Sequence, residues 1–501
     1  MTYYMRDINR GSLIFLGRGI LYGLISRILF IIGSYTIYIY AGRKLGAGLF
    51  GTFGIVISIV TISNIILNNG VRQTISKLIA LYPNSAYKIC KQSILGQLIL
   101  SIPISVVVSG LAGGIAAFFK DNNLVIPLRI CGIFILVRSL FYVFIGALNG
   151  QKRFLAENVV LSMYFIMRPA AAIFLIWLGF GIPGAIFGFL SAAILVTIVS
   201  IALFSNSPNE AFILTITDTL KPSIINIIIF GSSALLMSID LLFIKRLMVG
   251  SHYAGLYTAA TAFSKPPYWF LFPFGSIALP LVTLSFNGND IQQCRKYLSQ
   301  ILRYSILIFL PIIIIIAATS QSLIVFFFSP EYGPAGMPLK ILIFGIWFVG
   351  LTSIMAHFMI AMGKERLMAY MSLCCIGLDV IFNIFLVPKF GLMGAAISTS
   401  VSAFMLLFVS AYYIINEVGV EIKPLTFYRL TSLCALLYFV PQIPLFKRLS
   451  LPVSYIILYV GFALGLIVTR EIGPSDWLVI KRLVYPRIDS YYHELSDDTY
   501  R

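Results

Sequence analysis

Long apolar segments recur along the whole chain and alternate with short polar segments. An apolar segment of eighteen or more residues can cross the hydrocarbon core of a bilayer, roughly 30 Å thick, as a helix. Because a lipid-exposed segment must satisfy its backbone polar groups internally, the pattern predicts an all-α polytopic membrane protein with about fourteen transmembrane helices. The expected spans are about 19–41, 49–69, 94–118, 124–148, 158–178, 182–204, 223–249, 264–286, 303–319, 338–361, 367–387, 392–414, 427–446 and 451–469.

The segments outside the spans are short and polar. Residues 2–18 predict a short interfacial helix, and 470–501 a polar cytoplasmic tail. Pro441 and Pro444 interrupt the span 427–446, which makes it the least regular of the set. Composition agrees with a membrane protein, since 59% of the residues are hydrophobic and 11% are charged. A soluble domain carries roughly 25% charged residues.

The formal net charge of +18 bears on the partners of the protein and on its orientation in the membrane. In a soluble protein it would suggest a nucleic-acid partner. Here most basic residues lie in the loops, where they set orientation, so we expect membrane lipids and no nucleic acid as partners. With an even number of spans, both termini share one side, and that side carries roughly twice as many Lys and Arg residues as the other. The positive-inside rule therefore predicts a multi-pass protein of the cell membrane with both termini in the cytoplasm.

The chain contains an internal repeat. Several short motifs recur in the same order at an offset of about 205–213 residues, among them 46–53 with 250–257, 150–153 with 363–366, and 180–185 with 390–395. Each half would hold six helices of the same topology, a plan that places a transporter's binding site between two lobes. The expected division is an interfacial segment (1–18), an N-lobe (19–204), a cytoplasmic linker (205–222), a C-lobe (223–414), two further helices (427–469) and the tail (470–501).

Three stretches carry a family resemblance. The sequence AGRKLG at 41–46, followed by Phe50 and Gly51, resembles the start of polysaccharide transporters in the multidrug/oligosaccharidyl-lipid/polysaccharide flippase superfamily. Asp240 followed by AGLY at 254–257 resembles the start of their second lobe. Asp379, Asn383 and GLMGAA at 391–396 resemble the turn between their eleventh and twelfth helices. The resemblance implies a two-lobed carrier that turns lipid-linked sugars across the membrane.

Charged residues inside apolar spans are the strongest candidates for a functional site, because such residues usually face the bundle interior or a wet cavity. Arg27, Arg138 and Arg168 all fall in the first half of the chain. Together they predict an electropositive cavity suited to a phosphate or pyrophosphate, since guanidinium binds those oxygens through two parallel hydrogen bonds. The alternative is that each arginine pairs with a buried acid or with backbone carbonyls.

Two acids lie inside spans of the second half, Asp240 and Asp379. Intramembrane acids mark ion pathways, so they could couple transport to Na⁺, to H⁺ or to the membrane potential. Arg168 and Asp379 occupy near-equivalent positions of the repeat, which suggests an alternative, an ion pair between the lobes that substrate phosphate would break.

Basic pairs stand near the outer ends of the first and seventh helices, Arg43 with Lys44 and Lys245 with Arg246. We expect these four side chains to be solvated anchors, and a phosphate-release site is the alternative. The GxGxxG pattern at 46–51 lies between membrane helices, so it does not indicate a dinucleotide site. No zinc-ligand or catalytic-triad pattern is visible, so we expect no catalytic residue, no resident metal and no cofactor.

These observations predict a monomeric flippase, not an enzyme, for a polyprenyl- or dolichyl-(pyro)phosphate-linked oligosaccharide, with glycan-assembly enzymes as further partners. One alternative is a multidrug or small-molecule extruder of the same superfamily, for which acidic charges would be expected in the first lobe. A second is a membrane-embedded glycan ligase or polymerase, which would need long outer loops.

Overall fold

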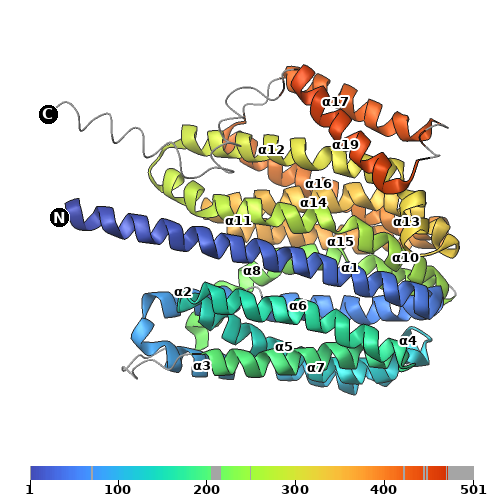
Figure 1. Ribbon diagram of the computed structural model, residues 1–501, viewed down its shortest axis with the longest axis horizontal. Helices are drawn as coiled ribbons and strands as arrows, with labels where there is room; N and C mark the ends of the chain where they lie inside the picture. The colour runs from blue at the N-terminus through green and yellow to red at the C-terminus, as the bar shows by residue number, and fades with distance from the viewer. Residues whose placement is uncertain are drawn as a thin grey trace. The chain divides into compact units, whose positions relative to one another are not determined.

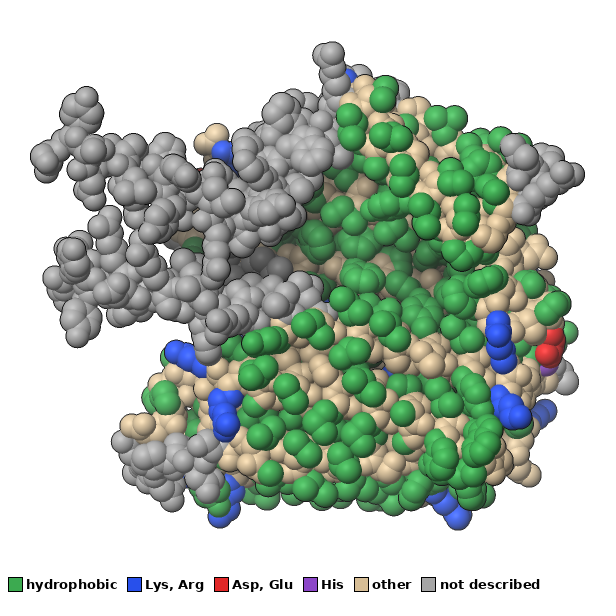
Figure 2. All heavy atoms as spheres, in the orientation of Figure 1, with side chains coloured by type: hydrophobic (Ala, Val, Ile, Leu, Met, Phe, Trp, Pro, Cys, Tyr) green, Lys and Arg blue, Asp and Glu red, His purple; other side chains and the backbone are tan. Residues whose placement is uncertain are grey.

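The structure is a computed structural model that describes residues 2–68, 71–204, 216–248, 250–420, 424–443, 446, 449–469 and 471. Every secondary-structure element in these ranges is an α-helix or a short 3-10 helix, so the predicted all-α fold is confirmed. Ten helices in the described ranges are long and apolar enough to span a membrane, or eleven if one bent pair counts as a span. On the face shown in Figure 2, hydrophobic side chains cover the middle of the helices and Lys and Arg lie near their ends.

The first two predicted spans belong to one bent element, α1 (Thr2–Asn68). The bend is at Gly46, whose φ of 73° and ψ of 165° are open to glycine but costly for other residues. After the bend the chain turns back along itself (Figure 1). The ring of Tyr38, before the bend, therefore lies 6.2 and 6.0 Å from the rings of Phe50 and Phe53, after it (centroid distances). The interfacial segment 2–18 is helical as predicted, but it continues into the first span without a break (Figure 1).

The rest of the N-lobe follows the prediction closely, except for one helix that lies between the second and third spans. That helix, α2 (Val71–Leu81), is too short and polar to be a span. The predicted third span is split into α3 and α4. The further elements are η1 (Pro83–Ser85), α3 (Ala86–Gly110), α4 (Ala112–Phe118), η2 (Asn122–Leu124), α5 (Val125–Gly150), α6 (Phe154–Trp177) and α7 (Gly181–Leu203).

In the C-lobe two predicted spans are broken helices. The first is α8 (Ile216–Leu236) with α9 (Ile239–Leu247), bent by 43°. The second is α10 (Ser251–Ser264) with α11 (Pro266–Asn287), and it begins earlier than predicted because the buried start of α10 is rich in small and polar residues. The remaining C-lobe elements are α13 (Ser320–Phe327), η3 (Pro330–Ala335), α14 (Gly336–Ala361), α15 (Glu365–Phe390) and α16 (Leu392–Val418).

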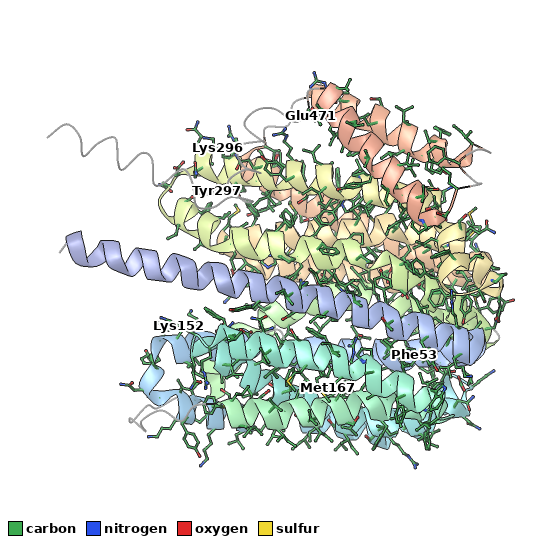
Figure 3. All side chains as sticks on the ribbon, in the orientation of Figure 1. Phe53, Lys152, Met167, Lys296, Tyr297 and Glu471 are labelled. Carbon is green, nitrogen blue, oxygen red and sulfur yellow. The ribbon has the colours of Figure 1, made fainter. Side chains whose placement is uncertain are left out.

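A second compact unit consists of residues 295–319 and 420–501, whereas the lobes described above form the first. Its described helices are most of α12 (Ile291–Ala318), α17 (Pro424–Phe439), η4 (Val440–Gln442) and α19 (Leu451–Val468). They share an apolar core that includes Leu307, Leu430 and Phe462. Glu471 is buried and forms ion pairs with Arg303 of α12 and Arg429 of α17. Figure 3 labels Glu471.

The interruption predicted for the thirteenth helix is present, because α17 ends before Pro441. The span at 303–319, which the repeat assigns to the C-lobe, packs instead within the second unit. The tail after 471 and most of the predicted linker, 205–215, lie outside the described residues.

Candidate functional site

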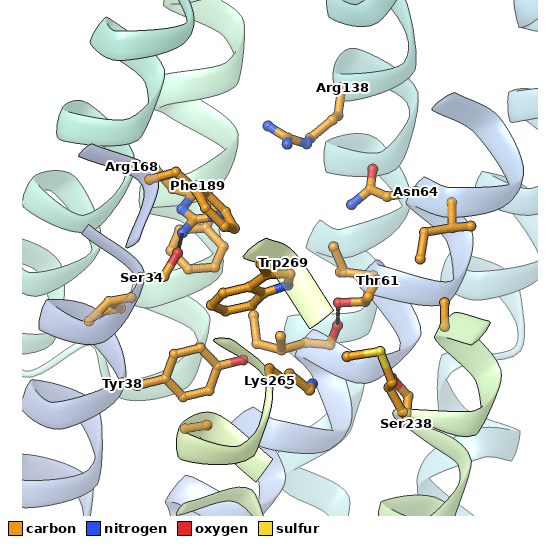
Figure 4. A pocket seen from close by; sticks show the side chains of 18 of the residues that line it. Ser34, Tyr38, Thr61, Asn64, Arg138, Arg168, Phe189, Ser238, Lys265 and Trp269 are labelled. Atoms are coloured by element: carbon orange, nitrogen blue, oxygen red, sulfur yellow. Dashed lines mark hydrogen bonds between the residues drawn. The ribbon is translucent and has the colours of Figure 1, made fainter. Parts of the chain in front are cut away.

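A cavity of about 380 Å³ lies between the N-lobe and the C-lobe. Its walls come from both arms of α1, from α2 and α5–α7, and from α8, α10 and α11 on the C-lobe side. Aromatic rings make up much of the wall. The described residues that line it include four basic side chains and no acidic one, and the basic ones are Arg72, Arg138, Arg168 and Lys265. Figure 4 labels the last three.

Arg138 on α5 is held by aromatic side chains. Its side chain is buried, and its Nη2 donates a hydrogen bond of 2.7 Å to the hydroxyl of Tyr142. The guanidinium carbon lies 4.2 Å from the ring centroid of Tyr164 and 4.9 Å from that of Tyr142. Ring faces stabilise a desolvated guanidinium without neutralising it. Because Nη1 has no hydrogen-bond partner, Arg138 keeps a donor for a ligand in the cavity.

Arg168 on α6 lies beside the same aromatic group. Its Nη2 donates to Ser34 Oγ at 2.9 Å, and its guanidinium carbon is 5.2 Å from the ring centroid of Phe189 and 5.7 Å from that of Tyr164. Its Nε is buried without a hydrogen-bond partner. Figure 4 shows Arg138 and Arg168 directed toward one space, with Lys265 and Trp269 on the other side of it. The cavity therefore presents two arginines that form no ion pair with an acid in the part of the chain that the structure describes.

Arg27 borders this site without lining it. Its Nη2 donates to the backbone oxygen of Trp269 at 3.0 Å, and Trp269 is part of the cavity wall. Arg27 therefore follows the alternative interpretation, in which an intramembrane arginine binds a backbone carbonyl.

Two cavity cations were missed by the sequence analysis. Lys265 falls at the start of the predicted span 264–286, but it lies at the junction of α10 and α11 and lines the cavity. Arg72 falls in the short segment after the predicted span 49–69, but it lies on α2 and reaches the cavity. Its Nη2 is 2.5 Å from Glu157 Oε1, so its charge is paired. Pro266 and Pro267 directly after Lys265 were a signal of a broken helix.

The two intramembrane acids lie together in the C-lobe, away from the cavity wall. Asp240 is fully buried and accepts hydrogen bonds from its neighbour's backbone N–H at 2.8 Å, from Thr399 at 3.2 Å and from Tyr257. Asp379 is also fully buried, and its Oδ1 accepts a hydrogen bond from Ser398 at 3.0 Å. The other oxygen of Asp379, Oδ2, makes no hydrogen bond of ordinary geometry, although the hydroxyl of Ser402 lies near the carboxyl group.

The suggested ion pair between Arg168 and Asp379 is not formed. Arg168 lies on α6, which packs against α1 and α7, whereas Asp379 lies on α15, which packs against α8, α9 and α16. Near-equivalent positions in a repeat place two residues on corresponding helices of separate lobes, and this does not by itself bring them into contact.

The outer basic pairs divide into different environments. Arg43 is exposed and donates to the backbone oxygens of Phe327 and Phe326 at 2.7 and 2.8 Å, and Lys44 is exposed. Arg246 is exposed too, with its guanidinium carbon 4.8 Å from the ring centroid of Phe118. The prediction is wrong for Lys245, which is buried and forms a salt bridge of 2.6 Å with Asp121.

Comparison with known proteins gives a family and a fold. A family described as "Polysaccharide biosynthesis protein" matches residues 43–336. The capsular polysaccharide biosynthesis protein CapF of Staphylococcus aureus is 33% identical over 98 residues, which are 20% of this chain and 24% of that protein. The chain thus spans about a quarter of the length of this curated relative.

Two solved structures have the same fold. The lipid II flippase MurJ in an inward closed conformation superposes with a TM-score of 0.71 at 17% identity, covering 92% of this chain and 99% of that one. An inward-facing multidrug resistance transporter of the MATE family superposes with a TM-score of 0.62 at 15% identity, covering 78% and 94%. The family match covers more than half of this chain. The chain is therefore a polytopic membrane protein of the polysaccharide biosynthesis protein family, and it belongs to the polysaccharide branch of the multidrug/oligosaccharidyl-lipid/polysaccharide flippase superfamily.

Proposed function

We propose that the protein is a flippase that moves a polyprenyl- or dolichyl-(pyro)phosphate-linked oligosaccharide across the cell membrane by alternating access, for the synthesis of a surface polysaccharide or glycan. The observation that carries the proposal is the acid-free basic cavity between the lobes. Arg138 and Arg168 hold unpaired N–H groups at its wall. Guanidinium donors of this kind bind phosphate oxygens strongly, because the hydrogen bonds are charge-assisted.

The same observation weighs against a multidrug extruder that carries organic cations. A cationic substrate would have to enter a cavity whose lining includes four basic side chains and no acidic ones. Placing like charges together in a low-dielectric site is costly, so an anionic head group is the better match. In the proposal both termini face the cytoplasm, the protein acts as a monomer, and the lipid tail stays in the bilayer.

The test is to delete the gene and to measure lipid-linked sugars on the cytoplasmic leaflet. The expected result is accumulation of one such lipid, relieved by the wild-type gene and by Arg366→Gln but not by Arg138→Gln or Arg168→Gln. Arg366→Gln is the matched control, because Arg366 is an exposed arginine outside the cavity. No accumulation together with unchanged surface glycans would overturn the proposal, and normal transport by the Arg168 variant would exclude that residue.

We further propose that Asp240 and Asp379 couple transport to Na⁺ or H⁺. Asp379 Oδ2 is buried and makes no hydrogen bond of ordinary geometry, although Ser402 lies near the carboxyl group. A buried carboxylate oxygen that is incompletely satisfied is costly unless it binds a cation or a proton. Asn383 and Thr399 bring further polar groups to the two acids.

The test of this second proposal is transport in proteoliposomes under an imposed Na⁺ or pH gradient. One of the gradients should accelerate transport by the wild type and by Asp290→Asn, an exposed control, but not by Asp379→Asn. If neither gradient changes the rate of the wild type, ion coupling at these acids is excluded.

A further inference from the structure

A buried ion pair joins the two lobes at one end of the cavity. Asp121 lies between α4 and η2 of the N-lobe, and Lys245 lies in the last turn of α9 of the C-lobe. Lys245 Nζ is 2.6 Å from Asp121 Oδ2, and the two side chains are only 2% and 5% exposed. The flippase proposal assigns no role to this pair, which lies outside the cavity wall.

Hydroxyl groups from both lobes complete the contact. Thr52 on α1 donates to Asp121 Oδ2 at 2.6 Å, and Ser251 on α10 donates to the same oxygen at 3.3 Å and also contacts Lys245. The second oxygen, Oδ1, accepts the backbone N–H of Asn123 at 3.1 Å. Burial alone would raise the pKa of Asp121, but the hydrogen bonds from Lys245 and Thr52 outweigh it and hold the pKa below its ordinary value. The carboxylate is therefore charged and fully satisfied.

The position of the ion pair relative to the cavity indicates what the pair controls. On α1 the cavity is lined only by residues between 30 and 38 before the bend and between 53 and 65 after it. The segment nearest the bend, 39–52, contacts the C-lobe through Arg43, which donates to two backbone oxygens of α13. The same segment holds the ion pair through Thr52, which donates to Asp121. By the positive-inside assignment this bend faces outward. The cavity cannot open past the bend unless Asp121 of the N-lobe separates from Lys245 and Ser251 of the C-lobe.

A buried ion pair suits a switch better than it suits simple stability. Removing one partner is strongly unfavourable because it leaves an uncompensated buried charge, whereas water that enters an opening cleft solvates both groups. We propose that Asp121 and Lys245, assisted by Thr52 and Ser251, form a latch that keeps the outer end of the cavity closed and must break for the cavity to open outward. This inference rests on the proposed alternating access, and it concerns the regulation of that site.

The test measures access to the cavity from outside the cell. The six native cysteines are replaced, and Thr61, which lines the cavity, is changed to cysteine as the reporter. Intact cells are treated with a membrane-impermeant maleimide, and the rate of labelling is measured. We expect Asp121→Asn and Lys245→Met each to raise the labelling rate at least about tenfold. Lys120→Met, which removes an exposed charge next to Asp121, should leave it unchanged.

A folding defect is excluded by labelling the same reporter from the cytoplasmic side in inverted vesicles, where the rate should be unchanged or lower. If the charge variants do not fold, Thr52→Val removes one hydroxyl at nearly constant volume and should raise outside labelling by a smaller factor. Outside labelling that stays at the wild-type rate in every latch variant overturns the proposal. Labelling reports the opening of the cavity whichever molecule the cavity carries, so the latch and the flippase proposal fail independently.

Discussion

Replacing Gly51 with alanine places one methyl group where α1 crosses α10. The added Cβ would lie 2.2 Å from the backbone oxygen of Ser251 and 2.6 Å from the backbone nitrogen of Gly255. Both neighbours are backbone atoms, so no side chain can rotate out of the way. The two helices would have to separate by roughly 0.8 Å to reach 3.0 Å, below which real Cβ contacts are essentially never found.

The energetic consequence follows from two opposing effects. Overpacking a well-packed contact costs about 1–3 kcal/mol. Alanine in place of glycine gains up to about 1 kcal/mol of helix propensity. Gly48 provides the matched control, because it lies in the same arm of α1 and a Cβ there would meet nothing within 4 Å. The propensity gain is common to both variants, so Gly51→Ala should be less stable than Gly48→Ala by about 2 kcal/mol.

The assay is the thermal unfolding midpoint of each purified variant in detergent. Because the entropy of unfolding grows with chain length, we expect the midpoint of Gly51→Ala to lie about 2 °C below that of Gly48→Ala. If strain is relieved by lobe separation, outside labelling of the cavity reporter should rise in Gly51→Ala alone. Equal midpoints for the two variants, with equal labelling, would refute the inference that the lobes are packed backbone to backbone at this end.

Three further results are expected. Lys265→Gln should lower transport about tenfold, because the cavity loses a charge-assisted donor, while the exposed control Lys389→Gln should not change the rate. The outer end of the cavity should stay closed as the external pH falls from 8 to 5. The carboxylate of Asp121 has a pKa below its ordinary value of about 3.9, so it is protonated, and the latch lost, only at a pH below this range. Faster outside labelling at pH 5 would contradict the role of Asp121. Glu471→Gln should lower the thermal midpoint, because the arginines of α12 and α17 lose a buried carboxylate worth about 1–3 kcal/mol; an unchanged midpoint would show that these contacts do not stabilise the second unit.

Hydropathy was sufficient to predict most of the helices and to identify the arginines in the middle of spans as candidates for a site. A charge in the centre of an apolar run has few stable positions, so Arg138 and Arg168 had to face a polar or aromatic interior, and the structure places both at the cavity. The bend between the first two spans was predictable for a similar reason, since Gly46 lies in the only polar stretch between them.

The positions that the sequence did not reveal depend on contacts between distant segments. Lys265 lies next to two prolines at the end of an apolar run, and hydropathy alone cannot distinguish the end of a span from a break in its middle. Asp121 and Lys245 are separated by 124 residues, and neither has a local pattern that indicates its partner. In the sequence each resembles an ordinary charge near the membrane surface, and only the packing of the lobes brings the two together.

The distribution of charge between the lobes suggests how the two proposed activities are connected. The unpaired cations Arg138 and Arg168 belong to the N-lobe, whereas the buried acids Asp240 and Asp379 belong to the C-lobe. A direct exchange between Arg168 and Asp379 is excluded in this conformation by their separate packing. The group that connects the two sets is Lys265, because it lines the cavity and also interacts electrostatically with Asp240. A cation or proton that neutralised Asp240 would weaken that attraction and leave Lys265 free to attract an anion, so Lys265→Gln should reduce the ion dependence of transport together with its rate.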